Sequence, residues 1–326
     1  MMSNYLFFRT LTLLNVFIRM KQVHGLTGKA LFVFGDSYLD TGNTAMGYSQ
    51  SWKQPYGMTY PQRPSGRWSD GRVWTDYIAL HLGIDSPVPY EQRAQKNLKS
   101  GMNFAYGGTG VFPTSVPYPT MSGQIDNFQK IISHGTYKAS DLKSSVALLA
   151  ASGNDITKFT NDKGGFATEQ DWSEFQAKMV SQIVKNMKRI SALGVKSIAV
   201  NALQPLSCFP TAGFSLGSCT DVSNQRAINQ NKMLMREMTK LANQNPQTKF
   251  YYLDIYSSWK STLNDPRFSS WSPCCKSCGN VDVTGAAQSS VCSNPDSAFF
   301  WDSIHPAQRG WKEVYSRMKK PFNPVR

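Results

Sequence analysis

The sequence has 326 residues, of which 40% are hydrophobic and 12% aromatic. This composition supplies enough apolar surface for a large core and excludes a disordered chain or a fibrous repeat. The formal net charge is +14, from 35 Lys and Arg against 21 Asp and Glu, which favours acidic surfaces such as acidic polysaccharide. The basic residues are scattered and no nucleic-acid-binding motif occurs, so nucleic acid is not an expected partner.

The first 25 residues have the features of a weak secretory signal. Arg9 precedes an apolar run over residues 11–18, and Arg19 and Lys21 follow it. This run is far shorter than the roughly 20 residues that a membrane-spanning helix needs. We therefore expect a signal peptide or, as the alternative, a basic tail at 1–25, and no transmembrane span. No linker-like composition divides the remainder, so residues 26–326 are expected to form a single domain of a secreted protein.

The cysteines are even in number and clustered in loop-like segments of the C-terminal part of the chain, which predicts disulfides. They are Cys208, Cys219, Cys274, Cys275, Cys278 and Cys292. The expected pairs are Cys208 with Cys219, and Cys274 or Cys275 with Cys278 and Cys292. A zinc site is the alternative, because Cys275 and Cys278 have the spacing of metal ligands. A second paired knuckle is missing, so bridges are favoured and no metal is expected.

Short apolar runs alternate with segments of helical periodicity along the chain. The expected strands cover 30–34, 102–106, 145–151, 196–200 and 250–255, and the expected helices cover 73–82, 174–193, 221–243 and 306–319. Such alternation is typical of a parallel sheet that is covered by helices on both faces. The predicted fold is a three-layer α/β/α sandwich with a central parallel sheet of about five strands.

Polar or glycine-rich turns follow three of these strands. Ser37 comes after Gly35 and Asp36, Gly107 opens the glycine-rich turn 107–110, and Asn154 follows the third strand. Carboxyl ends of parallel strands share one edge of the sheet, where ligands bind. The turn at Gly107 exposes backbone N–H groups that suit an oxyanion or a phosphate. It lacks the dinucleotide fingerprint, and its helix is deferred to about residue 122, so no cofactor is expected.

A candidate acid and base lie near the C-terminus, where Asp302 precedes His305 by three residues. A serine hydroxyl becomes a good nucleophile when an imidazole removes its proton and a carboxylate orients that imidazole. Ser37 is therefore the candidate nucleophile. The segment 213–217 also satisfies the nucleophile-elbow pattern around Ser215, but it lacks the strand before it and the helix after it that an elbow needs.

Four blocks resemble the GDSL esterase/lipase family of plants, within the SGNH hydrolase superfamily. They are Phe34-Gly-Asp-Ser37 with Asp40-Thr-Gly-Asn43, Gly101-Met-Asn-Phe-Ala-Tyr-Gly-Gly108, Gly153-Asn-Asp155, and Phe300-Trp-Asp-Ser-Ile-His-Pro306. The resemblance implies a flavodoxin-like SGNH fold from about residue 29 to the end. The chain departs from the motif at Tyr38, where the family usually has Leu, and we expect this residue to pack behind the turn.

The resemblance also implies the role of each site residue. Ser37 is the expected nucleophile, His305 the base and Asp302 its partner. The Ser37 and Gly107 N–H groups and the Asn154 side-chain amide are the expected oxyanion donors, with Gly108 as the substitute for Gly107. The implied activity is hydrolysis of carboxylic esters of a lipid, an acylated small molecule or a polysaccharide, without a metal or cofactor. An acyltransferase that uses the same site and a non-catalytic wall-binding protein are the alternatives.

Overall fold

The computed structural model describes residues 25–95, 97–151, 153–210, 219–222, 224–268, 271–280, 288–318 and 322–325. Nearly all of the expected leader at 1–25, and Ser215 of the elbow pattern, lie outside these residues. In the part of the chain that is described, no helix combines the length and the apolar character needed to cross a membrane.

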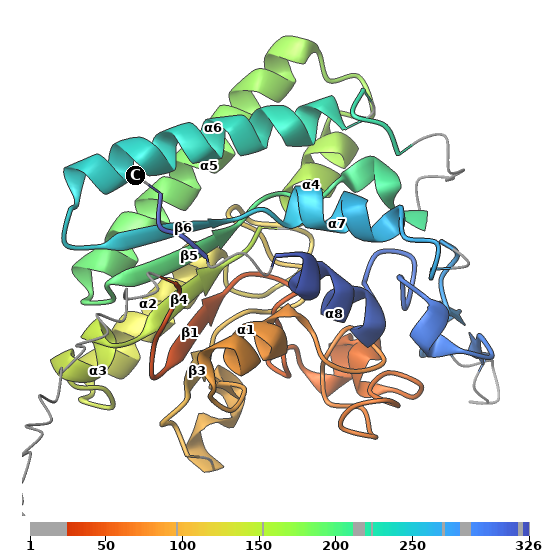
Figure 1. Cartoon of the computed structure of the whole chain (residues 1–326), viewed down its shortest axis with the longest axis horizontal. Helices are drawn as coiled ribbons and strands as arrows, with labels where there is room; N and C mark the ends of the chain where they lie inside the picture. The colour runs from red at the N-terminus through yellow and green to blue at the C-terminus, as the bar shows by residue number, and fades with distance from the viewer. Residues whose placement is uncertain are drawn as a thin grey trace, which may run out of the picture.

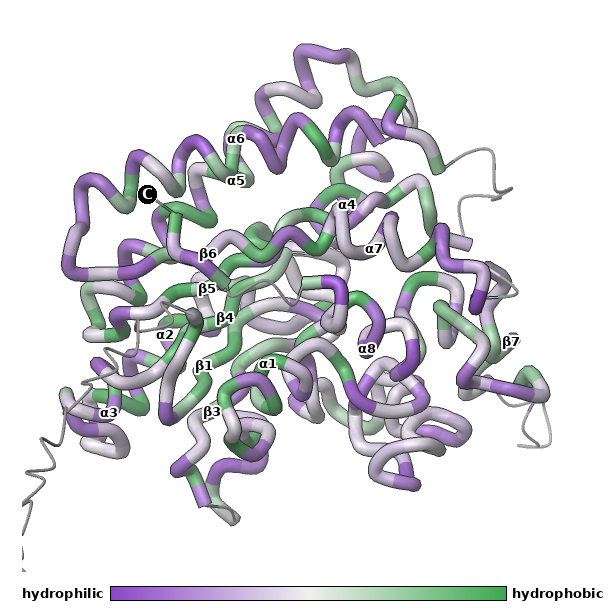
Figure 2. The backbone as a smooth tube through the Cα atoms, viewed as in Figure 1, coloured by the Kyte–Doolittle hydropathy of each residue, from purple (hydrophilic) through white to green (hydrophobic). Residues whose placement is uncertain are grey.

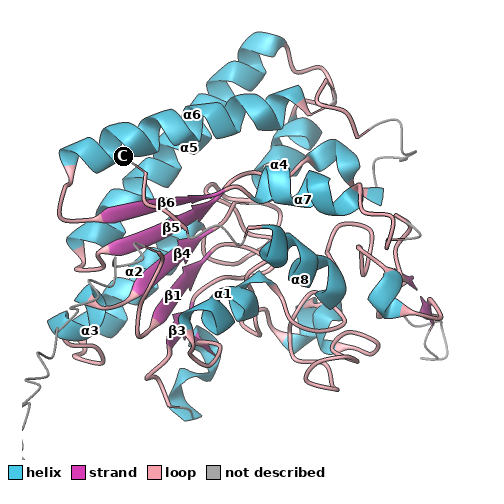
Figure 3. Ribbon diagram, viewed as in Figure 1, coloured by secondary structure: helices cyan, strands magenta, loops and turns pink. Residues whose placement is uncertain are grey.

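The centre of the molecule is a six-stranded sheet in which every neighbouring pair is parallel (Figure 3). Its strands are β1 (Leu31–Phe34), β2 (Val88–Pro89), β3 (Gly101–Asn103), β4 (Val146–Leu149), β5 (Ser197–Asn201) and β6 (Lys249–Leu253), in the order β2-β3-β1-β4-β5-β6. Without β2 this is the flavodoxin-like order. The five predicted strands are present. The two-residue edge strand β2 was not predicted, because it is very short and contains a proline, which argues against a strand when the sequence is read alone.

Helices cover both faces of the sheet, so the predicted three-layer architecture is confirmed (Figure 1). Leu31 and Val33 of β1 belong to one core cluster, together with residues of α1 (Trp74–Leu82), α7 (Ile255–Leu263) and α8 (Gln308–Arg317). Phe32 and Phe34 face the opposite cluster, which includes α2 (Met121–Ser133), α5 (Glu169–Ala192) and α6 (Gln225–Gln244). Successive residues of a strand point to opposite faces, so this fully apolar strand builds both cores (Figure 2).

The predicted helices are present with shifted ends, and several short ones were missed. The last helix begins at Gln308 with Ala307 as its N-cap, not at Pro306, because Pro306 forms a bridge with Phe300 and its carbonyl accepts a hydrogen bond from Ser69. The helices α3 (Ala139–Lys143), α4 (Asn154–Asp162) and α7 were not predicted. Of these, α4 carries Asn154 at its first position.

Sheet register brings the predicted site turns together. In the sheet, β1 lies between β3 and β4, with Val33 opposite Asn103 on one side and Phe34 opposite Leu149 on the other. The turns that follow these three strands therefore emerge side by side at the carboxyl edge of the sheet. A separate two-stranded ribbon of β7 (Cys275–Lys276) and β8 (Ser290–Val291) precedes the segment that carries Asp302 and His305.

Candidate active site

Ser37, His305 and Asp302 form one continuous hydrogen-bonded chain. The Ser37 Oγ lies 2.8 Å from the His305 Nε2, and the His305 Nδ1 lies 2.9 and 2.8 Å from the two carboxylate oxygens of Asp302. All three distances fall within hydrogen-bonding range. When Nδ1 carries the ring proton, it donates a hydrogen bond to Asp302. Nε2 is then unprotonated and accepts a hydrogen bond from the serine hydroxyl. The structure thus brings together the three residues that the sequence singled out.

The nucleophile turn is held by a buried glutamine from α2. The Gln124 side chain accepts a hydrogen bond from the Gly35 N–H at 2.8 Å and donates one to the Gly35 carbonyl at 2.9 Å. Gly35 itself adopts φ +155°, and a Cβ there would lie 2.5 Å from the Ala150 carbonyl oxygen of the neighbouring strand end. Only glycine fits this close approach. The turn that carries Ser37 is therefore held by Gln124 on one side and by the neighbouring strand end at Ala150 on the other.

The loop that carries the acid and base is organised by Asp302 itself. Its Oδ1 accepts hydrogen bonds from the backbone N–H groups of Ile304 and His305 at 2.9 and 2.8 Å. Burial raises the pKa of Asp302, but the opposing charge of His305 and these hydrogen bonds together hold it below its usual value. Asp302 is thus kept as a carboxylate, the form that orients an imidazole.

Aromatic residues enclose the base. The Trp68 ring stacks on the His305 ring, with 5.0 Å between centroids, and the Tyr38 ring meets it edge-on at 5.7 Å. Tyr38 is buried, but it borders the cleft beside Ser37 and does not simply pack behind the turn as expected, and its hydroxyl reaches across to the base loop. These contacts leave the imidazole little freedom to rotate away from Ser37.

The Gly107 N–H, which was expected to be an oxyanion donor, is already hydrogen-bonded within the protein. It donates to the Asp40 Oδ2 at 3.1 Å and to the Thr44 Oγ1 at 2.8 Å. Our assignment of Gly107 is therefore corrected, because its donor is already bonded inside the protein. The next amide, that of Gly108, has no hydrogen-bond partner within the described part of the chain. The Gly108 N–H replaces it as the candidate donor.

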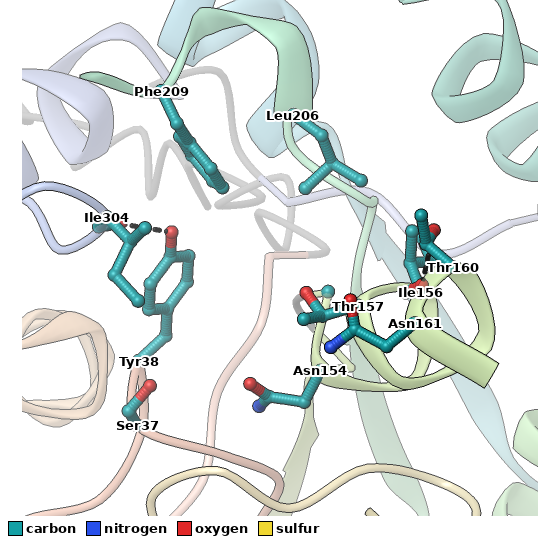
Figure 4. A pocket seen from close by; sticks show the side chains of 11 residues that line it. Ser37, Tyr38, Asn154, Ile156, Thr157, Thr160, Asn161, Leu206, Phe209 and Ile304 are labelled. Carbon is teal, nitrogen blue, oxygen red and sulfur yellow. Dashed lines mark hydrogen bonds between the residues drawn. The ribbon is translucent and has the colours of Figure 1, made fainter. Parts of the chain in front are cut away.

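Asn154 lies across the cleft from Ser37 (Figure 4). Its Nδ2 donates one hydrogen bond to the Thr109 carbonyl at 2.9 Å. A primary amide has two N–H donors, so the second remains for a ligand. The adjacent Asp155 accepts hydrogen bonds from the Val111 and Phe112 N–H groups at 3.0 and 2.9 Å, and thereby supports that loop.

Further residues that shape the site were not assigned roles from the sequence. Asp40 accepts the Gly42 and Asn43 N–H groups at 2.8 and 2.7 Å, and the Asn43 side chain donates to the carbonyls of Asn103 and Ala105 at 2.8 Å each. Together they fasten the nucleophile segment to the strand end that precedes Gly108. In the sequence, the only indication of their importance was that they belong to the quoted blocks.

A cleft of about 510 Å³ opens beside Ser37. In Figure 4, Tyr38, Ile304 and Phe209 border one side, and Asn154 and Thr157 of α4 border the other. Leu206 closes the far end. A cleft of this size fits one small ligand, and its apolar wall suits a hydrocarbon group.

Disulfides link all six cysteines. The bonds are Cys208–Cys219, Cys274–Cys292 and Cys275–Cys278. The pairing agrees with the prediction and resolves which of the adjacent cysteines takes which partner. The zinc alternative is wrong for Cys275 and Cys278, because the thiolates that would bind the metal are joined to each other.

Known proteins match the chain over most of its length. A family model described as GDSL-like Lipase/Acylhydrolase covers residues 31–318. One GDSL esterase/lipase of Arabidopsis thaliana is 45% identical over 313 residues, which are 89% of this chain and 86% of that protein. The chain belongs to the GDSL-like lipase/acylhydrolase family. A second GDSL esterase/lipase of the same plant is 42% identical over 90% of this chain and 88% of its own length.

Among solved structures, a lipase from a goat rumen metagenome is similar, with a TM-score of 0.41 and 10% identity over 91% of this chain and 99% of that one. Membership of the GDSL family makes this chain a carboxylic ester hydrolase. The resemblance drawn from the four sequence blocks is thereby confirmed.

Proposed function

We propose that the chain hydrolyses carboxylic esters through an acyl-enzyme on Ser37, with His305 as general base and acid and Asp302 as the group that orients it. The substrate is the ester of a lipid, an acylated small molecule or a polysaccharide. The observation that supports this is the hydrogen-bonded series from the Ser37 Oγ to the His305 Nε2, and from the His305 Nδ1 to Asp302. The Ser37 end of this series lines a cleft that suits one small ligand.

Acylation begins when the Ser37 Oγ attacks the ester carbonyl and the His305 Nε2 takes the hydroxyl proton. The carbonyl oxygen becomes an anion in the tetrahedral intermediate. The imidazolium then gives its proton to the alcohol oxygen as the C–O bond breaks, and the alcohol leaves. Asp302 stabilises the positive charge on the ring throughout. In the second half, His305 removes a proton from water as the water oxygen attacks the acyl carbon. The imidazolium then returns that proton to the Ser37 Oγ as its bond to the acyl carbon breaks, and the carboxylic acid leaves.

The oxyanion needs donors that are already in place. The candidates are the Ser37 and Gly108 backbone N–H groups and the second N–H of the Asn154 amide. Loss of one such donor raises the barrier by about 3 kcal/mol in serine hydrolases. Asn154 is well placed for this role because its bond to the Thr109 carbonyl fixes the amide in one orientation.

Active-site labelling tests this proposal directly. A fluorophosphonate ester reacts with an activated serine, and mass spectrometry of the digested protein identifies the modified peptide. We expect the adduct on Ser37, together with hydrolysis of p-nitrophenyl butyrate. Ser37→Ala should abolish both the labelling and the hydrolysis, and circular dichroism should show that this variant is folded. Ser215→Ala is the matched control and should retain both. Labelling of Ser215 in place of Ser37 would show that the nucleophile is the serine of the elbow pattern.

The same assay separates hydrolysis from acyl transfer. With the ester in water and then with a sugar or glycerol added as acceptor, we expect the free acid as the main product in both. Accumulation of a new ester at the expense of the acid would make the chain a transferase. An absence of turnover with intact folding would support the non-catalytic alternative.

We also propose secretion and association with acidic polysaccharide. The arguments are the leader-like composition of 1–25, the three disulfides and the net charge of +14. Expression of the full chain in a plant host, followed by N-terminal sequencing of extracellular protein, tests the first. Retention on polygalacturonate that is lost as salt rises tests the second, and retention on a neutral glucan to the same extent would contradict it.

A further inference from the structure

Asp302 has a hydrogen-bond donor besides those of its own loop. The Tyr56 hydroxyl donates to the Asp302 Oδ2 at 2.8 Å. The Oδ1 is occupied by the backbone N–H groups of Ile304 and His305, while both oxygens lie within reach of the imidazole. The tyrosine thus adds a hydrogen bond to the Asp302 carboxylate from outside the loop that carries Asp302. It comes from a segment 246 residues earlier in the chain.

The position of this hydroxyl is fixed by packing. The Tyr56 side chain is only 3% exposed, and its ring meets the rings of Trp68 and Trp301 edge-on at 5.8 and 6.3 Å. Its backbone N–H donates to the Lys53 carbonyl at 3.1 Å. Trp68 in turn stacks on His305. One aromatic cluster therefore holds both the tyrosine and the base in place.

The tyrosine is a donor at every working pH. Burial, and the neighbouring charge of Asp302 after it, raise the pKa of Tyr56 far above its ordinary value. Because the phenol stays protonated and the carboxylate stays ionised, Tyr56 is always the donor of this hydrogen bond and Asp302 always the acceptor. Hydrogen bonds to ionised acceptors are roughly twice as strong as neutral ones.

We propose that Tyr56 is a positioning residue for the acid–base pair, whose hydroxyl orients Asp302 and reduces its basicity, and so sets the pH at which His305 becomes available as a base. The proposal rests on the proposed function of Ser37, His305 and Asp302. Its physical basis is that a donated hydrogen bond draws negative charge from the carboxylate, which then stabilises the imidazolium less. Removal of the hydroxyl leaves a more basic carboxylate and a ring that holds its proton to higher pH.

Other charged and titratable groups face this pair. Tyr38 and Asp36 belong to the nucleophile turn, and both Asp36 and Asp302 interact electrostatically with the Tyr38 hydroxyl. Lys276 of β7 lines the small cleft on the far side of the pair, together with Tyr56 and Trp68. These groups are unchanged by a substitution at Tyr56, so the effect of the hydroxyl can be isolated.

The chain supplies a matched control in Tyr38. Its hydroxyl also donates to the base loop, but the acceptor is the Ile304 carbonyl oxygen at 2.7 Å and not the carboxylate. Tyr56→Phe and Tyr38→Phe each remove one hydroxyl from a buried ring and one hydrogen bond to the same loop. Only the first removes a hydrogen bond to Asp302.

The first measurement is the pH dependence of kcat/KM for p-nitrophenyl butyrate. For Tyr56→Phe we expect the midpoint of the acidic limb to move upward by about 0.7 of a pH unit, the size of a net hydrogen bond of ~1 kcal/mol divided by 1.36 kcal/mol per unit. We also expect kcat on the plateau to fall several-fold with KM unchanged. Tyr38→Phe should leave the midpoint where it is. Equal midpoints for the wild type and both variants would reduce Tyr56 to a packing residue.

The second measurement needs no substrate. An NMR titration follows the ring protons of the histidines, and the signals of His305 are identified by their loss in His305→Gln. The midpoint for His305 should move upward in Tyr56→Phe and stay unchanged in Tyr38→Phe. If the titration shows this shift while the wild type hydrolyses no ester, the coupling stands and the proposed function fails. If the wild type hydrolyses esters normally and the His305 midpoint is the same in Tyr56→Phe, the coupling is disproved and the proposed function stands.

A third variant covers the case in which Tyr56→Phe does not fold. 3-Fluorotyrosine at position 56 keeps the ring and the hydroxyl but makes the hydroxyl a stronger donor. Both midpoints should then move downward, opposite to the effect of phenylalanine. Unchanged midpoints in this variant would equally overturn the proposal.

Discussion

The Tyr38 hydroxyl donates a hydrogen bond to the Ile304 carbonyl oxygen at 2.7 Å and thereby joins the nucleophile turn to the loop that carries the base. The two residues lie 266 positions apart in the chain. Leucine, the residue that the resemblance leads one to expect at this position, has no hydroxyl to donate. In this chain the residue next to the nucleophile therefore contacts the base loop directly.

We predict that Tyr38→Phe destabilises the fold by about 1 kcal/mol, the usual net value of one hydrogen bond. The ring stays in place against Trp259 and Trp311, so the packing is conserved. Chemical denaturation of the purified variant measures the difference. Tyr48→Phe is a suitable control, because that side chain is 78% exposed and its hydroxyl should contribute little. Equal losses in both variants would show that the bond to Ile304 adds no stability.

We predict that Asn154→Ala lowers kcat by about a hundredfold or more while KM changes little. The amide meets the carbonyl oxygen most strongly once negative charge has developed, so the loss falls on the transition state. Steady-state kinetics on one soluble ester gives both constants. Asn154→Asp keeps the shape but replaces the donor by a negative charge, and it should be at least as damaging. A normal kcat in folded Asn154→Ala would remove this residue from the oxyanion site.

The buried ion pair between Arg67 and Asp76 provides a pH-dependent prediction. The guanidinium binds both carboxylate oxygens, with Nε and Nη2 each 2.9 Å from its partner, and the side chains are 11% and 2% exposed. Burial raises the pKa of Asp76, but the charge and hydrogen bonds of Arg67 outweigh it and the net shift is downward. The pair therefore stabilises the fold above the unfolded pKa of about 4 and ceases to do so as pH falls through the lower, folded value.

We expect Arg67→Ala to lower the free energy of unfolding by about 3 to 5 kcal/mol at pH 7, because a buried charge is left without its partner. The deficit should shrink as the pH falls, because without Arg67 the buried Asp76 takes up its proton at a higher pH than in the wild type, and it should be smallest below the lowered pKa of the wild-type carboxyl. Denaturation at a series of pH values measures this. Lys158→Ala, which breaks the exposed pair with Asp162, should change stability by under about 1 kcal/mol at any pH. A deficit for Arg67→Ala that is independent of pH would assign the loss to packing.

The Cys274–Cys292 disulfide supports the base loop through its backbone. The Cys274 and Cys275 N–H groups donate to the carbonyls of Phe300 and Trp301 at 3.0 and 2.7 Å, immediately before Asp302. Replacing Cys274 and Cys292 by alanine opens a loop with a sequence separation of 18, which costs about 3 kcal/mol by loop entropy. We predict that thermal stability and kcat fall together, since the segment that carries the acid and base loosens.

Replacing Cys275 and Cys278 is the matched comparison, because that bond closes a separation of only 3 and should contribute about half as much. Reduction of the wild-type protein should reproduce the combined effect of opening the bridges, and a zinc chelator should have none. Inactivation by the chelator with reduction harmless would restore the metal-site interpretation that the S–S bonds contradict.

The sequence by itself determined the layers of the fold and singled out the three residues that the structure joins by hydrogen bonds in the candidate site. Fully apolar strands such as Leu31–Phe34 require cover on both faces, and polar residues such as Ser37 and Asn154 that follow such strands come together at one edge. Asp302 and His305 are three residues apart, so their contact is local. The β2 edge strand and the short helix α4 escaped prediction because their periodic signal is too brief.

Tertiary structure alone decided which groups complete the site. The direction of the Gly107 N–H depends on Asp40, 67 residues earlier in the chain, and that contact leaves the donor role to Gly108. The hydroxyl of Tyr56 reaches Asp302 only because the segment that carries Tyr56 and Trp68 packs against the base loop. A hydrogen bond is directional and short-ranged, so residue type and spacing identify the groups that are able to form it. The partner that each group finds is fixed by how distant segments pack.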